Sequence, residues 1–286
     1  PYRKNLDHYF IFIISVFVRQ NGNICPFNTA DSWVILSDIE RSIKEKIERI
    51  GTPLKDWDIQ INYGIKTGFN EAFIIDGAKR KELIEQDPKS DEIIRPILRG
   101  RDIKRYGYDF ADSWLINTHN GIKEKGIKPI NIKDYPAIKK HLDGYWKEIE
   151  KRADQGITPY NLRNCAYWED FSKQKIMYSE IVREPQFYLD KEGKYFPEAT
   201  SFILTGENLT YLYHLLHSKA VTYFFKMFYA GGGLGESGYR YKKAFLELLP
   251  VPKPKNKIYF NDKNLDTEVY KIYQLTEEEI TLIENQ

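Results

Sequence analysis

The chain has 286 residues, of which 42% are hydrophobic and 29% are charged, a composition typical of a soluble globular protein with a sizeable core. Its net charge is only +2, but the charge is unevenly distributed. Residues 262–286 contain seven acidic and two basic residues, a balance of −5, so residues 1–261 carry +7. A basic body with an acidic tail favours a polyanionic partner for the body.

Neither a membrane span nor a secretory leader is predicted. The longest apolar run, residues 10–18, has nine residues, which is too short to cross a bilayer, and no small-residue cleavage site follows it. Two cysteines, Cys25 and Cys165, lie far apart without metal-type spacing, which indicates a reducing, cytoplasmic setting. Because the chain begins at Pro1 and not at Met, we expect it to be a fragment of a longer protein.

The first half of the chain alternates short strands with helices. Residues 1–30 are interpreted as a remnant of a preceding domain or a linker from it. Ser37 and Glu40 have the spacing of a capping box, which predicts a helix that runs to about Ile50. The other elements predicted here are a strand at residues 32–36, a hairpin over residues 57–75 with Gly64 and Gly68 at its turn, a helix at 79–86, a strand at 114–116 and a helix at 135–151.

The second half is rich in strands before it becomes helical. Strands are predicted at residues 172–180, 186–189, 195–196 and 201–204, followed by an aromatic helix at 210–228, a glycine cluster at 231–238 and a Pro/Lys-rich linker at 250–254. A last helix, capped by Thr276, lies in the acidic tail. The predicted fold class is α+β, with a β-rich core, supporting helices and a C-terminal helical tail. The predicted division is a remnant at 1–30, a main domain at 31–254 and a tail at 255–286.

Patterns for catalysis are weak. A DNA amino-methyltransferase needs a Pro-Pro-aromatic motif to hold its target amine, and this chain has no Pro-Pro. The G-x-G-x-x-G at residues 233–238 follows a predicted helix, whereas a dinucleotide site places that motif between a strand and a helix. His214 and His217 could face one metal ion, but no third ligand is suggested. We therefore predict neither catalytic nor metal-binding residues.

A metal-dependent nuclease remains an alternative. Such an enzyme needs an acid-x-Lys pattern to hold Mg²⁺ and position water, and Asp102–Lys104 and Glu192–Lys194 match it loosely. Such a short pattern also arises often by chance. Docking of the chain on another protein is a further alternative.

Clusters of bases with aromatic residues give the clearer signal, which is for binding. Residues 95–106 hold five bases and one acid, and arginines there can form bidentate bonds to guanine edges or to phosphate. We expect Gly100 to let the backbone come close to a partner. A second loop, flanked by Gly64 and Gly68, offers donors that could approach a groove. The residues predicted to contact DNA are Lys66, Thr67, Asn70, Arg99, Arg101, Lys104, Arg105, Arg163, Tyr239, Arg240 and Lys242, and Tyr160 and Trp168 accompany Arg163.

Long ordered motifs in this sequence resemble a known family. Residues 33–37 and 50–57 resemble the start of the TaqI-like C-terminal specificity domain of type IIG restriction–modification enzymes of the Eco57I-like class. The resemblance continues through residues 64–75, 94–106, 135–163, 175–180, 215–219, 249–252 and 269–280, nearly the whole chain after residue 30. His217 departs from the pattern, because Asn is expected there.

The resemblance implies a target-recognition domain that reads double-stranded DNA through the major groove. In the family, this domain follows a methyltransferase domain, which flips out an adenine and methylates it with S-adenosylmethionine, and an endonuclease domain often lies further upstream. We therefore expect a bacterial parent enzyme that uses S-adenosylmethionine and Mg²⁺, and a chain that itself holds no cofactor. The expected partners are duplex DNA and the methyltransferase domain of the same polypeptide, with no membrane partner.

Overall fold

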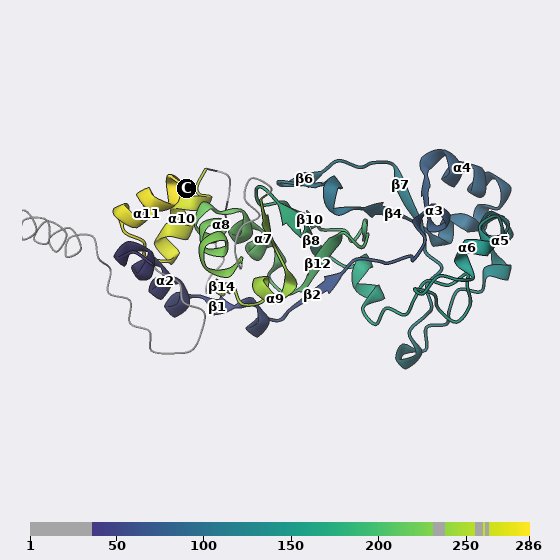
Figure 1. Ribbon diagram of the computed structural model, residues 1–286, viewed down its shortest axis with the longest axis horizontal. Coiled ribbons are helices and arrows are strands. Elements are labelled where there is room, and N and C mark those ends of the chain that lie inside the picture. Colours follow the sequence, from purple (N-terminus) through teal and green to yellow (C-terminus); the bar gives the residue numbers. More distant parts are fainter. Residues whose placement is uncertain (1–35, 231–237, 255–259, 261–262) are drawn as a thin grey trace, which may run out of the picture.

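The computed structural model describes residues 36–230, 238–254, 260 and 263–286 (Figure 1). The predicted remnant at residues 1–30, the apolar run at 10–18 and all but Leu36 of the predicted strand at 32–36 lie outside the described residues, as does the glycine cluster up to residue 237. The fold class is α+β, as predicted. No helix within the described ranges is long and apolar enough to span a bilayer.

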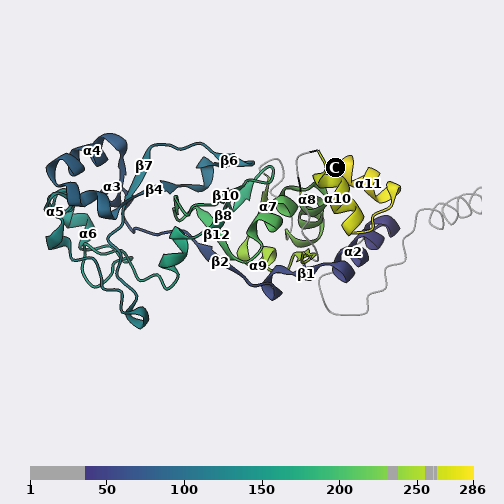
Figure 2. The same ribbon diagram turned by 180° about the vertical axis from the view of Figure 1, so that it is seen from behind.

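A four-stranded antiparallel sheet occupies the middle of the molecule, and Figures 1 and 2 show it from opposite sides. Its strands, in spatial order, are β10 (Phe187–Asp190), β8 (Lys175–Ser179), β12 (Ser201–Gly206) and β2 (Ile59–Tyr63). β8 pairs with β10 and β12, and β12 places Leu204 opposite Ile61 of β2. The outermost pairing therefore joins segments about 140 residues apart in the chain.

This central sheet is apolar on both faces because it separates two hydrophobic cores formed by the described residues. In β8, Tyr178 points into the first core, whereas its neighbour Met177 points into the second. In β12, Leu204 and Ile203 divide in the same way. All residues of β8 are buried, as expected for a strand covered on both sides.

The first core is covered by helices. They are α2 (Asp38–Ile50), α7 (Leu209–His217), α8 (Lys219–Phe224), a π-helical turn at Phe225–Tyr229, α9 (Lys243–Leu246), α10 (Leu265–Ile272) and α11 (Glu277–Glu284). Figure 1 shows α2, α10 and α11 together at one end, next to the pair β1 (Thr52–Pro53) and β14 (Pro250–Val251). The buried Glu279 of α11 accepts hydrogen bonds from Ser42 (2.7 Å) and Lys46 (2.6 Å) of α2. The acidic tail is thus tied to the first described helix.

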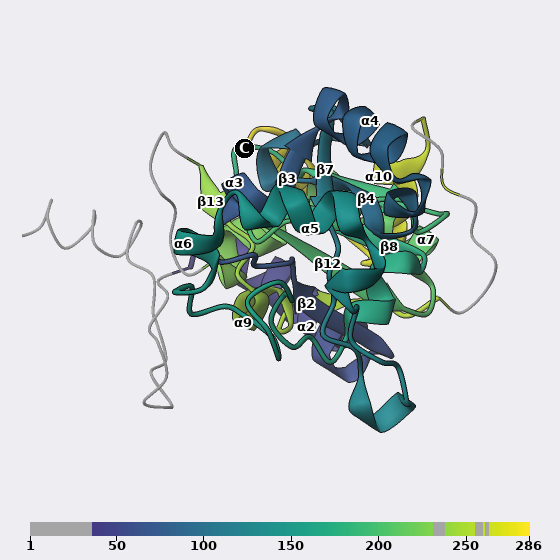
Figure 3. The same cartoon turned by 90° about the vertical axis from the view of Figure 1, so that its right-hand side faces the viewer.

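The second core lies on the other face of the sheet, under a smaller mixed sheet and a group of helices. The sheet has the order β11 (Phe196–Pro197), β4 (Ile94–Leu98), β7 (Ser113–Ile116) and β3 (Ile74–Asp76). Its helices are α3 (Asn70–Phe73), α4 (Gly77–Gln86), α5 (Pro136–Asp143) and α6 (Trp146–Ile149), and Figure 3 views the molecule from this end. Two short pairs complete the strands: β5 (Ile103–Lys104) with β6 (Gly107–Tyr108), and β9 (Ile181–Val182) with β13 (Tyr239–Arg240).

The predicted hairpin over residues 57–75 is wrong. β2 pairs with β12, and β3 pairs with β7, so the two strands belong to different sheets. After Gly64, the chain passes so close to Glu198 that a Cβ at Gly64 would lie 2.0 Å from the Glu198 carbonyl oxygen. This close approach carries the chain from one sheet to the other, and the glycine is required for packing instead of for a turn.

Two predicted helices are interrupted. The helix at 135–151 divides into α5 and α6 around Gly144 and Tyr145. The aromatic helix divides at Ser218, whose extended backbone ends α7 and whose hydroxyl accepts a hydrogen bond from the Val221 N–H as the N-cap of α8. The predicted caps of α2 and α11 are confirmed, each as a capping box.

A buried ion pair joins β8 to the end of β10. Lys175 Nζ donates to Asp190 Oδ2 at 2.6 Å, and both side chains are almost fully buried. The Asp190 carboxylate also accepts the backbone N–H groups of Lys194 and Tyr195. Burial lowers the pKa of Lys175, while Asp190 opposes that shift by favouring the charged amine.

We predict that Asp190→Ala lowers the free energy of unfolding by about 3–5 kcal/mol, because it leaves the Lys175 ammonium buried without its counter-charge. The control is Glu192→Ala, an exposed acid in the same turn, which should change stability by no more than about 0.5 kcal/mol. Urea unfolding followed by circular dichroism measures both. Equal stability of the two variants would contradict this account of the ion pair.

Candidate nucleic-acid interface

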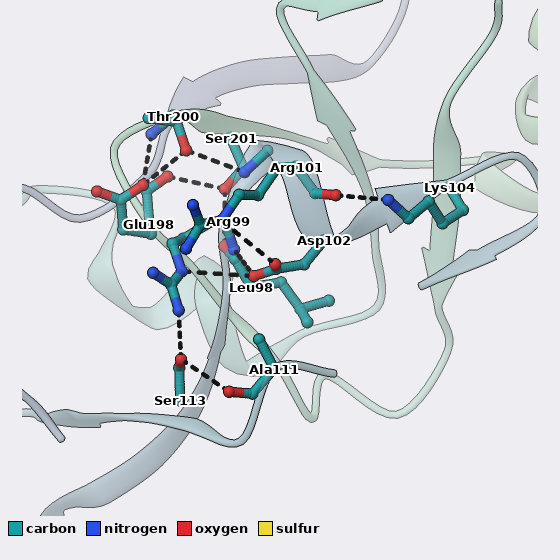
Figure 4. Close-up of polar contacts among 11 residues, drawn as sticks. Leu98, Arg99, Arg101, Asp102, Lys104, Ala111, Ser113, Glu198, Thr200 and Ser201 are labelled. Carbon is teal, nitrogen blue, oxygen red and sulfur yellow. Dashed lines mark hydrogen bonds and ion pairs between the residues drawn. The ribbon is translucent and has the colours of Figure 1, made fainter. Parts of the chain in front are cut away.

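The basic segment at residues 95–106 forms β4, a turn of 3-10 helix at Gly100–Asp102 and β5 (Figure 4). Its first base, Arg95, is used inside the protein, because its guanidinium donates to the carbonyls of Asp91, Glu92 and Ile94. Arg95 therefore caps the end of the preceding 3-10 helix, and the outward-facing charge of the segment begins after it.

Arg99 is also held from behind. Its Nη2 donates to Ser113 Oγ at 2.6 Å, its Nε lies 3.6 Å from Asp102 Oδ2, and only 28% of its side chain is exposed (Figure 4). The same Asp102 carboxylate accepts the Arg99 backbone N–H at 2.8 Å. Asp102 is buried and works as the fixed centre of the turn. The acid of the nuclease alternative is thus engaged with two arginines, since Arg101 Nε lies 3.9 Å away.

Gly100 makes its close approach within the chain and not to an outside partner, which corrects our expectation. It is buried, its N–H donates to Thr200 Oγ1 at 2.9 Å, and a Cβ there would lie 2.4 Å from the Thr200 carbonyl oxygen. Glu198 completes this contact by accepting from the Thr200 hydroxyl and N–H. Ser201 then donates to the Leu98 carbonyl, so the basic turn is tied to the first residue of β12 (Figure 4).

Three bases of the segment point outward. The exposed fractions of their side chains are 73% for Arg101, 45% for Lys104 and 38% for Arg105. Their nearest carboxylates lie 3.7–3.9 Å away, farther than a direct hydrogen bond, so these contacts are weak and screened by solvent. The turn therefore presents three cations on a backbone that is fixed from below.

Arg105 also lines a pocket of about 220 Å³ with two bases that the sequence analysis did not select, Lys219 and Lys226. Lys219 begins α8 and pairs with Glu284, and Lys226 is exposed on the π-helical turn. The two lysines are seven residues apart, which is two helical turns, so their spacing alone could have placed them on one face. Together they extend the cationic surface of the turn.

His217 lies behind this pocket and is not a metal ligand in the structure. It is buried, and its Nδ1 lies 2.9 Å from the Tyr213 carbonyl oxygen. Burial lowers its pKa to about 4, with nearby Arg105 also opposing protonation, so the ring is neutral at pH 7. Within the described ranges, no three His, Cys, Asp or Glu side chains come together in a way that could hold a metal ion.

The loop after β2 contributes a second group of predicted residues. Lys66 is exposed, whereas Thr67 is only 1% exposed and its hydroxyl donates to Asn70 Oδ1 at 2.6 Å. Thr67 thus shapes the start of α3, and its side chain does not reach the surface in this conformation. Asn70 itself is exposed.

The buried Arg152 organises this loop, a role that the sequence analysis missed. Its guanidinium donates to the carbonyls of Thr67 and Asp154, and to those of Pro159 and Asn161, and it lies 4.3 Å over the ring of Phe73. Burial lowers its pKa to about 10, so it stays charged at pH 7. A buried cation can be recognised only after folding shows the carbonyls that surround it.

Arg163, whose side chain is half-exposed, pairs with Asp154 at 3.0 Å and lines one pocket together with Lys66 and Trp168. Tyr160 lies outside that pocket and donates to Asp143 at 2.5 Å. The structure thus brings Lys66 and Arg163 together, although 97 residues separate them in the sequence.

The last predicted cluster is mainly structural. Tyr239 is buried beside Tyr241, with their hydroxyl oxygens 3.3 Å apart. Arg240 is partly buried on β13, where it pairs with Ile181 of β9. Lys242 is exposed and lies over the ring of Phe245. Of this cluster, Lys242 is the residue with a fully accessible charge.

We predict that Arg99→Ala destabilises the protein by about 1–3 kcal/mol, because the buried Asp102 carboxylate and the Ser113 hydroxyl lose a charged donor. Arg101→Ala, two residues away and largely exposed, should change stability by no more than about 0.5 kcal/mol. Chemical denaturation of both variants measures the difference. If Arg99→Ala is as stable as Arg101→Ala, Arg99 is not a structural anchor of the turn.

Comparison with known proteins gives one family. A family model described as the TaqI-like C-terminal specificity domain matches residues 95–251, which is more than half of the chain. A type II methyltransferase, M.BstVI of Geobacillus stearothermophilus, is 25% identical over 282 residues, which cover 89% of this chain and 46% of that protein. The chain thus spans about half the length of this curated relative.

Two solved structures are also similar. The type IIL restriction–modification enzyme MmeI, in complex with DNA, is 15% identical with a TM-score of 0.49 over 75% of this chain and 27% of that one. The type IIG restriction endonuclease BpuSI is 15% identical with a TM-score of 0.46 over 84% of this chain and 28% of that one.

Proposed function

The chain belongs to the family of TaqI-like C-terminal specificity domains, and from this premise we propose that it recognises a short double-stranded DNA sequence for a larger restriction–modification enzyme. The observation that carries the proposal is the basic turn. Arg101, Lys104 and Arg105 point outward, while Arg99, Gly100 and Asp102 fix its backbone from below.

Cations on a rigid turn are suited to duplex DNA. Phosphate contacts set the position of a protein on the duplex, and bidentate arginine contacts to guanine distinguish base pairs. Arg101 is the least restrained guanidinium of the turn and is therefore our candidate for base contact. Lys104, Arg105, Lys219 and Lys226 are our candidates for phosphate contact, because a Lys behaves as a point charge and Arg105 already donates to the His217 carbonyl.

The chemistry of the parent enzyme is part of the same proposal. Methylation of adenine with S-adenosylmethionine and Mg²⁺-dependent cleavage would belong to other domains of the polypeptide, with the methyltransferase domain as the direct neighbour of this chain. A cytoplasmic location is consistent with that role. The proposed contribution of this chain is to position the target, and it needs no cofactor for that.

The experiment is a salt series of duplex-DNA binding, followed by fluorescence anisotropy with the parent enzyme. The affinity of the wild type should fall linearly on a log–log plot against salt concentration, because bound counterions are released from the DNA. Replacement of Arg101, Lys104 and Arg105 by Ala together should weaken binding and reduce the slope of that plot by up to about 3, roughly 1 for each lost phosphate contact.

The matched control replaces three exposed lysines elsewhere, Lys55, Lys81 and Lys147, by Ala, which removes the same charge. Its slope should stay close to that of the wild type. An equal loss in the two triple variants would mean that only net charge matters. Binding that does not depend on salt, or no binding to duplex DNA, would overturn the proposed function.

A further inference from the structure

A pocket of about 350 Å³ lies where three distant segments meet. They are the end of β2 and the loop after it (residues 63–66), the loop after β7 (residues 119–121) and the segment at residues 162–168. Its volume is in the range of small-molecule sites, which is about 300–1,000 Å³. The basic turn at residues 99–105 does not line it.

The walls of the pocket are aromatic. Trp168 and His119 stack with ring centroids 4.2 Å apart and planes at 31°. Burial lowers the pKa of His119, and its Nδ1 accepts the Gly121 N–H at 3.1 Å, so the ring is neutral at pH 7 and carries its proton on Nε2. The ring of Tyr63 is 52% exposed, which is unusual for so large a side chain. Tyr167 also lines the space.

Cations and amides complete the lining. Lys66 is exposed and has no acidic partner among the residues that the structure describes. Arg163 pairs with Asp154 through Nη1, which leaves other guanidinium donors available. Asn164 is exposed and accepts from the Asn120 side chain, so its own amide group remains free to donate. The pocket thus combines flat apolar rings with positive charge.

The pocket is held in shape without a ligand. Arg152 donates to carbonyls on both sides of it, at Thr67 next to Lys66 and at Asn161 near Arg163. Trp168 is fixed by its Nε1–H, which donates to Asn117 Oδ1 at 3.2 Å. Binding would therefore require little ordering of the protein.

We propose that this pocket receives one unstacked nucleotide of a DNA strand, with its base against the rings of Tyr63, His119 and Trp168 and its phosphate at Lys66 and Arg163. Every base has an aromatic face, so rings of this kind accept an extruded base, and the cations match the charge that accompanies it. The inference rests on the proposed function, because duplex binding must bring the strand to the pocket.

The experiment compares three duplexes that differ at one position. The first is fully paired, the second carries one unpaired nucleotide, and the third carries an abasic nucleotide at that position. We expect the parent enzyme to bind the second about tenfold more tightly than the other two, because its base is already unpaired and available for stacking. Equal affinity for the second and third duplexes would overturn the pocket assignment.

Ala166→Trp tests the location, because Ala166 is exposed and lines the pocket, so that the added indole fills the space without removing a charge. The control is Ala78→Trp at an exposed position of α4 that is not part of the pocket lining. The preference for the unpaired nucleotide should disappear in the first variant and persist in the control. If Ala166→Trp fails to fold, Tyr63→Leu should reduce the same preference.

Two outcomes are distinguishable from a failure of the proposed function. Retention of the preference in a folded Ala166→Trp variant would overturn the pocket assignment while duplex binding stands. Binding of free deoxyadenosine monophosphate in the pocket, with no preference among the three duplexes, would overturn its assignment to a DNA strand. Absence of binding to the fully paired duplex would overturn the proposed function itself.

Discussion

The structure depends on a sheet that must be apolar on both of its faces. β8 and β12 send alternate side chains into two different cores, so neither core can form without the sheet between them. Burial of apolar surface on both faces is the dominant favourable contribution to such an arrangement. The Lys175–Asp190 pair closes one edge, and its cost of desolvation is accepted because the carboxylate also orders the turn that follows β10.

The sheet also sets the position of the candidate interface. Ser201 opens β12 and donates to the carbonyl of Leu98, while the neighbouring Thr200 accepts from Gly100. The basic turn is therefore fixed to the most buried part of the molecule. A cation held in this way loses little freedom when it binds, which favours specific contact over loose attraction. The same logic applies to Arg152, which spends its charge on carbonyls and leaves Lys66 and Arg163 at the surface.

Local features of the fold could be predicted from the sequence, and long-range ones could not. The capping boxes that begin at Ser37 and Thr276 were predicted because their signal lies within four residues. The pairing of β2 with β12 was missed because a hairpin and a distant strand have the same alternating pattern. The division of the aromatic helix at Ser218 was also missed, because the apolar pattern runs through it.

The candidate site follows the same division. Composition found the basic segment, but it could not show that Arg95 and Arg99 serve the fold while Arg101 points outward. Burial of Thr67 and Tyr239 is likewise a tertiary property. The pocket at Tyr63 and Trp168 joins segments about 100 residues apart, which no local pattern reports. The resemblance to the specificity-domain family was found from ordered motifs, and the family model confirms it.

The central claim is that this chain reads a DNA sequence. The most direct test is selection of duplexes bound by the parent enzyme from a pool with a randomised central region, followed by sequencing of the bound fraction. The account predicts enrichment of one short motif, and loss of preference at one or more of its positions when Arg101 is replaced by Ala, because each good bidentate contact contributes about 1–3 kcal/mol of discrimination. A bound fraction with the same sequence distribution as the starting pool would contradict the account.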